Sequence, residues 1–123
     1  MAKVILDTNF ILHCVENKVD FYEEIAGLGH KVVIPREVIS EIERIKNSTK
    51  SLKVRERAIL ALKIIVSEPH EEISCSGRYV DTGIKNYLKD KPEIMLATLD
   101  KDLKRAVRGR KLVIRNKKKL EVQ

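Results

Sequence analysis

The sequence predicts a single α/β domain, a three-layer α/β/α sandwich around a central and mostly parallel sheet. Short apolar stretches with strand character alternate along the chain with amphipathic stretches of helical period, which is typical of a parallel sheet covered by helices. The stretch at 94–97 does not alternate between apolar and polar residues, as expected for a strand buried on both faces. Since no linker or internal repeat interrupts the pattern, we expect one domain over residues 1–123.

The first half of the chain is expected to contain two strands and four helices. In order, these are a strand at Lys3–Leu6, helices at 10–18 and 20–29, a strand at Lys31–Pro35, and helices at 36–47 and 51–69. Asp20 suits the N-cap of the second helix, and Pro35 suits the first turn of the third. The third helix carries Val38, Ile42 and Ile45 on one side, which is the spacing of a buried helical stripe.

The second half is expected to contain three further strands. The elements are a strand at 71–77, a helix that begins at Asp81, a strand at 93–100, a helix at 101–110 and a last strand at Lys111–Arg115. Gly77 should break the third strand, because glycine inside a strand pattern marks a bend. Asp100 directly follows the clearest apolar run of the chain.

Composition narrows the class of protein. With 123 residues and 43% hydrophobic content, the chain is long enough for one core. The longest apolar run, 58–66, is too short to span a bilayer and contains Lys63. No signal-peptide pattern is evident, so we expect a soluble cytoplasmic protein with no membrane association. Cys14 and Cys75 have no metal-type spacing and are expected to be small core residues.

The basic excess is confined to the C-terminal segment. Residues 101–123 contain ten Lys or Arg against Asp102 and Glu121, a net charge of +8, whereas the whole chain has +7. Such a block is typical of a nucleic-acid contact, although a solvated tail that aids solubility has the same composition. The segment therefore suggests RNA or DNA as a partner without proving it.

Acidic residues are expected to gather at one edge of the sheet. Asp7 and Asp100 each follow an apolar strand, and the carboxyl ends of parallel strands meet at the same edge. Asp81 lies in line with the buried stripe of its helix. Glu41 and Glu43 flank the two sides of the stripe in the helix at 36–47, and spacing alone does not choose between them.

Each acid also has a structural interpretation. Asp81 and Asp100 suit helix N-caps, and a glutamate on a helix is often only solvated. The set is harder to explain that way, because carboxylates gathered at one edge repel each other. A cation relieves that repulsion, and oxygen ligands select Mg²⁺ or Mn²⁺. Such an ion can activate water and stabilise a phosphodiester under attack.

Four stretches together resemble the PIN-domain nucleases, most closely small archaeal members related to ribosomal-RNA-processing proteins and to VapC-type toxins. These are VILDTNFIL, VVIPREVISEI, VDTGI and MLATLDKDLKRAV, and the resemblance runs from Val4 to about Leu120. By position, the resemblance implies that the catalytic, metal-binding acids are Asp7, Glu41, Asp81 and Asp100. It favours Glu41 over Glu43.

The resemblance further implies supporting roles for Thr8, Asn9 and Thr98, with Asp102 as a possible fifth acid. Thr82 and Gly83 depart from the family pattern, and Gly83 is expected to loosen the start of its helix.

The resulting hypothesis is a metal-dependent endoribonuclease in RNA processing or turnover. The RNA-binding candidates are basic residues of the C-terminal segment: Lys104, Arg105, Arg108, Lys117, Lys118 and Lys119. Aromatic residues make up only 4%, so stacking on bases should not dominate, and Tyr79 is expected to be ordinary packing. The resemblance also implies a possible homodimer, and either an antitoxin or a ribosome-assembly partner.

Several alternatives remain open. A VapC-type toxin would use the same four acids, so the acids alone do not separate it from a processing enzyme. A PIN fold kept as an inactive RNA-binding or assembly module would be favoured by loss of an acid, and none is lost. The Toprim fold matches Asp100 and Asp102, but it needs Glu where the first strand is followed by Asp7. A receiver domain needs Asp after the third strand, where Ser76 and Gly77 stand instead.

Overall fold

The computed structural model describes residues 2–116 and 118–123. Helices and strands alternate along most of this part of the chain. In order they are β1 (Lys3–Leu6), α1 (Thr8–Glu16), α2 (Phe21–Gly27), β2 (Lys31–Pro35), α3 (Arg36–Ser48), α4 (Leu52–Ser67), β3 (Glu71–Ile73), α5 (Val80–Leu88), β4 (Met95–Ala97), α6 (Lys101–Ala106), β5 (Lys111–Arg115) and β6 (Lys119–Val122). None of the helices in the described residues has the length and apolar composition needed to cross a bilayer.

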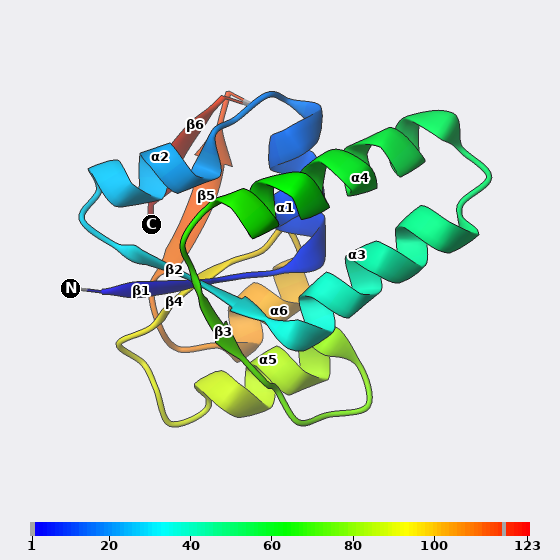
Figure 1. The fold of residues 1–123 in the computed structure, drawn as a ribbon. Helices are drawn as coiled ribbons and strands as arrows, with labels where there is room; N and C mark the ends of the chain where they lie inside the picture. Colours follow the sequence, from blue (N-terminus) through cyan, green and yellow to red (C-terminus); the bar gives the residue numbers. More distant parts are fainter. Residues whose placement is uncertain (1, 117) are drawn as a thin grey trace.

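The strands form one mixed sheet in the order β3-β2-β1-β4-β5-β6. The first five strands are parallel and β6 is antiparallel to β5. Figure 1 shows α1, α2 and α4 on one side of this sheet and α5 and α6 on the other. The predicted three-layer α/β/α architecture with a mostly parallel sheet is therefore confirmed.

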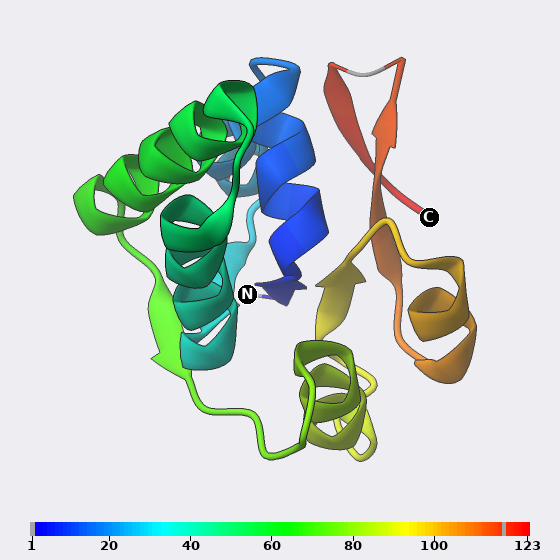
Figure 2. The ribbon, with the colours of Figure 1, turned by 90° about the vertical axis from the view of Figure 1, so that its right-hand side faces the viewer.

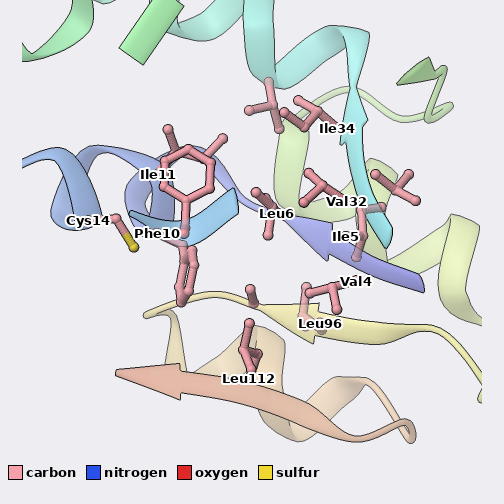
Figure 3. Close-up of a cluster of buried hydrophobic side chains, with 14 of the residues drawn as sticks. Val4, Ile5, Leu6, Phe10, Ile11, Cys14, Val32, Ile34, Leu96 and Leu112 are labelled. Carbon is pink, nitrogen blue, oxygen red and sulfur yellow. The ribbon is translucent and has the colours of Figure 1, made fainter. Parts of the chain in front are cut away.

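Strand β1 lies at the centre of the core. Val4, Ile5 and Leu6 are fully buried, because β2 and β4 pair with β1 on its two edges and helices cover its faces. Figure 3 shows these side chains among Leu96, Leu112, Phe10, Ile11 and Ile34, which come from β4, β5, α1 and β2. This packing explains why the strand is apolar without alternation.

The chain changes direction across the sheet next to β1. From β1 it proceeds through β2 to β3, and it then crosses back to β4 on the other side of β1. In open α/β sheets, such a switch point leaves a crevice outside the carboxyl ends of the two neighbouring strands. Asp7 directly follows β1 at this point, and its N–H donates to the carbonyl of Ala97 in β4 over 3.0 Å.

Some predicted bounds were wrong. The third strand ends at Ile73 instead of Gly77, because the next residues turn toward α3, where the N–H of Cys75 donates to the Glu37 carboxylate. The helix predicted at 101–110 ends at Ala106. The following backbone is held by the Lys111 ammonium, which donates to the carbonyls of Val107 and Gly109.

Strand β6 was not predicted. Its pattern is nevertheless that of an edge strand, with Lys119 and Glu121 exposed, Leu120 buried and Val122 half-buried. The Leu120 N–H donates to the Glu24 carboxylate of α2 over 3.2 Å, so the hairpin is tied to the helical layer. Figure 2 shows this β5–β6 hairpin on the opposite side of the molecule from α3 and α4.

Candidate active site

A cleft of about 630 Å³ lies at the carboxyl edge of the sheet. It is bordered by the end of β1, one face of α3, the loop before α5 and the N-cap of α6. The residues that line it are Asp7, Asn9, Arg36, Glu37, Ser40, Glu41, Arg44, Gly77, Arg78, Tyr79, Val80, Asp81, Thr82 and Asp100. All four acids predicted as metal ligands are therefore around one cleft.

Asp7 is the most enclosed of these acids, with 7% of its surface exposed. Its Oδ1 accepts from the N–H of Thr8 over 2.8 Å, so it caps α1. Its Oδ2 accepts from the Thr98 hydroxyl over 2.8 Å. The carboxylate is thus fixed by the helix that follows β1 and by the residue that follows β4.

The environment of Asp7 disfavours its negative charge. Burial raises the pKa of the Asp7 carboxyl, and the charges of Glu41 and Asp100 raise it further. The hydrogen bonds from Thr98 and Thr8 act in the opposite direction without cancelling the increase. A bound cation would offset both the burial and the repulsion.

Thr98 connects Asp7 to Asp100. Its hydroxyl donates to Asp7 and accepts from the N–H of Asp100 over 3.1 Å. The Oδ1 of Asp100 accepts from the N–H groups of Asp102 and Leu103, which makes Asp100 the N-cap of α6. Asp100 is therefore both a structural cap, as one interpretation predicted, and part of the cleft.

Glu41 and Asp81 come to the cleft from two different helices, α3 and α5. Glu41 is half-buried on α3 and lines the cleft, whereas Glu43 is exposed and does not. Asp81 is exposed in the first turn of α5 and accepts from the N–H of Thr82 over 2.9 Å. The N-cap of α5 is Tyr79, so the N-cap interpretation of Asp81 was wrong.

Two glycines set the position of Asp81. Gly77 has φ +155°, and a Cβ on it would lie 2.7 Å from the backbone nitrogen of Gly83. A Cβ on Gly83 would lie 3.0 Å from the Cβ of Cys75. The two positions let the loop after β3 approach α5 more closely than side chains allow. Gly83 therefore serves close packing, in contrast to the predicted loosening of the helix.

Glu37 was missed by the sequence interpretation. Its carboxylate accepts from the Cys75 N–H and from the Ser74 hydroxyl, each over 2.9 Å. The backbone hydrogen bond from Cys75 is the main reason that the pKa of Glu37 is lowered. Glu37 is a cleft residue already committed to holding α3 against the loop after β3.

Three arginines of the cleft were also missed. Arg36 and Arg44 lie on α3, where Arg36 pairs with Glu72 over 3.3 Å, and Arg78 precedes Tyr79 in the loop before α5. Positions 36, 40 and 44 have the i, i+4 spacing of one helix face, which is a signal that the sequence carries. Tyr79 is 63% exposed beside Arg78, so its interpretation as ordinary packing was wrong.

The remaining predicted residues lie outside the cleft. Thr8 is buried behind it, and its hydroxyl has no hydrogen-bond partner among the described residues. Asp102 has a side chain that is 95% exposed, 3.9 Å from Arg105. Lys104, Arg108, Lys118 and Lys119 line no part of the cleft, and Lys117 lies outside the described residues.

The donor set suits a hard divalent cation. The four acids offer only oxygen ligands, and Asp7 is a buried carboxylate beside two further negative charges. In this conformation, no three His, Cys, Asp or Glu side chains of residues 2–116 and 118–123 converge closely enough to hold a metal ion. The chemistry of the site therefore fits a cation, while the carboxylates are spread around the cleft.

Comparisons with known proteins concern nearly the whole chain. A sequence profile of the family described as "PIN like domain" matches residues 4–118. Ribonuclease VapC4 of Methanocaldococcus jannaschii is 30% identical over 128 residues, covering 99% of this chain and 97% of that protein. The rRNA-processing protein fcf1 of Schizosaccharomyces pombe is 33% identical over 110 residues, covering 85% of this chain. The match takes in 53% of fcf1, so the chain spans about half of that protein.

Two solved structures extend the comparison. The PIN domain endonuclease Utp24 has a TM-score of 0.79 and 28% identity, covering 98% of this chain and 90% of that one. VapBC2 from Rickettsia felis, bound to a DNA fragment from its promoter, has a TM-score of 0.59 and 18% identity, covering 92% and 99%. At that identity, the second likeness concerns the fold alone.

Proposed function

The chain belongs to the PIN-like domain family, and on that premise we propose that it is a divalent-metal-dependent endoribonuclease. The observation that carries the proposal is the setting of Asp7, which is buried and hydrogen-bonded, with Glu41 and Asp100 close enough to raise its pKa. The named activities of two relatives, a ribonuclease and a PIN domain endonuclease, support the same chemistry.

In this proposal, Asp7, Glu41, Asp81 and Asp100 would hold Mg²⁺ or Mn²⁺. The bound ion would supply positive charge and an activated water for hydrolysis of a phosphodiester. Thr98 keeps Asp7 and the backbone of Asp100 in register through its two hydrogen bonds. These bonds reduce the reorganisation that the carboxylates need when substrate arrives.

The RNA backbone would run along the carboxyl edge of the sheet. Arg36, Arg44 and Arg78 border the cleft on the β2–β3 side and can bind phosphates. On the other side, β5 is parallel to β4, so the carboxyl end of β5 at Arg115 lies at the same edge. We therefore propose two RNA contacts. The cleft arginines form the first, and the basic C-terminal segment forms the second.

The favoured role is processing or turnover of structured RNA. The similarity to fcf1, named as an rRNA-processing protein, and the TM-score to Utp24 support this role. A specific observation favours the second candidate, a VapC-type toxin, because the match to VapC4 covers nearly all of both chains. A toxin would have an antitoxin partner, whereas a processing enzyme would have a ribosome-assembly partner. A homodimer is compatible with either role.

The test compares two neighbouring glutamates of α3. Wild type, Glu41→Gln and Glu43→Gln are incubated with a structured ribosomal RNA fragment, with EDTA, Mg²⁺ or Mn²⁺. We expect internal cleavage by wild type and Glu43→Gln only when metal is present, and loss of at least about 100-fold in rate for Glu41→Gln. Equal cleavage by all three proteins would show contamination or a different site. Binding without cleavage by wild type would identify the inactive RNA-binding module.

A second experiment separates the two roles. Wild type and Asp7→Asn are each expressed alone in cells that lack any cognate partner. A processing enzyme should leave growth unchanged in both cases. Prompt growth arrest by wild type only, together with cleavage of transfer or ribosomal RNA at one site, would establish the toxin instead.

A further inference from the structure

A second cavity, of about 650 Å³, lies at the opposite edge of the sheet from the acidic cleft. It is formed where α2, the end of α4 and the first residues of β2 and β3 meet. Lys31 and Glu71, which begin those two strands, line it, whereas the acidic cleft lies beyond the strands' carboxyl ends. Figure 1 shows α2 and the chain between α4 and β3 on the same side of the molecule.

Two buried polar atoms on its lining residues lack a partner. These are the hydroxyl of Tyr22 and Nδ1 of His30, neither of which forms a hydrogen bond among the described residues. Tyr22 is only 7% exposed. Burial raises the pKa of its hydroxyl, and so does the charge of Glu68, which also lines the cavity. Within the described part of the chain, the Tyr22 hydroxyl is therefore an unpaired polar atom in the wall of the cavity.

The lining is acidic although the protein as a whole is basic. Four carboxylates, those of Asp20, Glu23, Glu68 and Glu71, face a single lysine. Glu71 is neutralised by Lys3 at 2.8 Å, and Asp20 caps α2 through the N–H of Glu23. No salt bridge to Glu23 or Glu68 is found among the described residues. With a formal net charge of +7, a cation is attracted only where the local charge is reversed.

The walls also limit the kind of cation. Ala26, Val32, Pro69 and the ring of Tyr22 provide apolar surface beside the carboxylates. A bare metal ion would contact the carboxylates alone and leave this apolar wall without a partner. An organic cation matches both surfaces, because its stem packs on the apolar wall and its N–H groups face acceptors.

We propose that this cavity binds an organic cation, a guanidinium or primary ammonium group carried on a short apolar stem. Glu68 and Glu23 supply the opposite charge. The Tyr22 hydroxyl and His30 Nδ1 accept hydrogen bonds from the cation. The proposal is independent of the nuclease function, since none of these residues lines the acidic cleft.

Calorimetric titration with agmatine, spermidine and N-acetyl-argininamide tests the proposal. The protein contains no Trp, so tyrosine fluorescence provides a second readout of binding near Tyr22. Saturating Mg²⁺ is present throughout to occupy the acidic cleft. We expect saturable 1:1 binding of at least one of the three cations, and none of the neutral isostere N-acetyl-citrullinamide. Absence of saturable binding would overturn the proposal.

Variants locate the site. Tyr22→Phe and Glu68→Gln should each weaken binding about tenfold, because each removes one hydrogen-bonding or charged partner. The matched controls Tyr87→Phe and Glu43→Gln, both remote from the cavity, should bind like wild type. Equal affinity of all five proteins would refute the assignment. Thermal melts exclude unfolding as the cause, and exposed Glu68 is the variant least able to disturb the fold.

The same titrations separate the two sources of such a cation. Tight binding of N-acetyl-argininamide and of an arginine-containing tripeptide supports a side chain from a basic protein segment. Binding of agmatine or spermidine alone supports a free metabolite. Either outcome supports the site, provided that Glu68→Gln weakens the binding about tenfold.

Discussion

The hydroxyl of Thr98 is the only side-chain group seen to link two acids of the cleft in the described residues. Thr98→Val keeps the shape and removes both hydrogen bonds, which leaves Asp7 buried with one donor fewer. We expect a loss of about 1–3 kcal/mol in the free energy of unfolding, measured by urea denaturation without metal.

Thr8 offers the matched control, because its buried hydroxyl has no partner among the described residues. Thr8→Val removes an unsatisfied hydroxyl. The free energy of unfolding should therefore be unchanged or higher by up to about 1 kcal/mol. If both valine variants lose stability equally, the hydrogen-bonding role of Thr98 is wrong.

A second residue-scale prediction concerns Asp7 and pH. Because its pKa is raised above the ordinary value of 3.8, the native state holds this proton more tightly than the unfolded chain does. Stability therefore falls as pH rises from the ordinary value through the raised one. Asp7→Asn should melt several degrees higher than wild type at neutral pH in EDTA.

That difference should disappear in acid, below the ordinary pKa, where Asp7 is protonated in both states. The exposed Asp102→Asn controls for the general effect of removing one negative charge. If the higher melting temperature of Asp7→Asn persists unchanged in acid, burial of the charged Asp7 carboxylate is not its cause. Added Mg²⁺ should reverse the order at neutral pH, since the cation stabilises only the carboxylate.

At the scale of elements, the contact between the β3–α5 loop and α5 depends on Gly77. Gly77→Ala places a Cβ against the backbone of Gly83 at a φ that side chains rarely adopt. We expect a loss of about 2–3 kcal/mol in stability and reduced cleavage, because Asp81 moves with the start of α5. Gly27→Ala, where a Cβ meets nothing within 4 Å, is the control and should be neutral or stabilising.

The elements that the sequence predicts best are those whose pattern is local. The runs ending at Leu6 and Ala97 have no alternation, so their burial on both faces could be inferred, and with it the place of Asp7 and Asp100. The edge strand β6 was not predicted, because only Leu120 and Val122 lie on its inner side. Next to the lysine run 117–119, this short alternation is too weak a pattern to indicate a strand.

Contacts between distant residues could not be predicted in the same way. Spacing left Glu41 and Glu43 equivalent, because both flank the same stripe, and the fold exposes only Glu43 fully. The bonds of Glu37 to Ser74 and Cys75 join residues 37 and 38 positions apart. No local sequence pattern indicates such a pairing. The lowered pKa of Glu37 and its structural role could therefore be recognised only in the structure.

At the scale of the whole molecule, two basic regions flank the acids. Changing Arg36, Arg44 and Arg78 to Ala should reduce the slope of log affinity for single-stranded RNA against log salt by roughly 0.7 per lost contact. Changing Lys117, Lys118 and Lys119 gives the matched comparison at the C-terminal turn. An unchanged slope in the arginine variant would place the RNA path away from the cleft. An unchanged slope in the lysine variant would make that turn a solvated bystander.

The hydrogen bond between Thr98 and Asp7 spans 91 positions of the chain. During translation, Asp7 therefore leaves the ribosome long before Thr98. The edge of β1 that pairs with β4 stays unpaired until β4 has also emerged. A nascent chain that exposes only its first four helices has neither Thr98 nor Asp100, and hence no complete cleft. Under the proposed nuclease function, cleavage would therefore begin only after β4 and Asp100 have emerged and β4 has paired with β1.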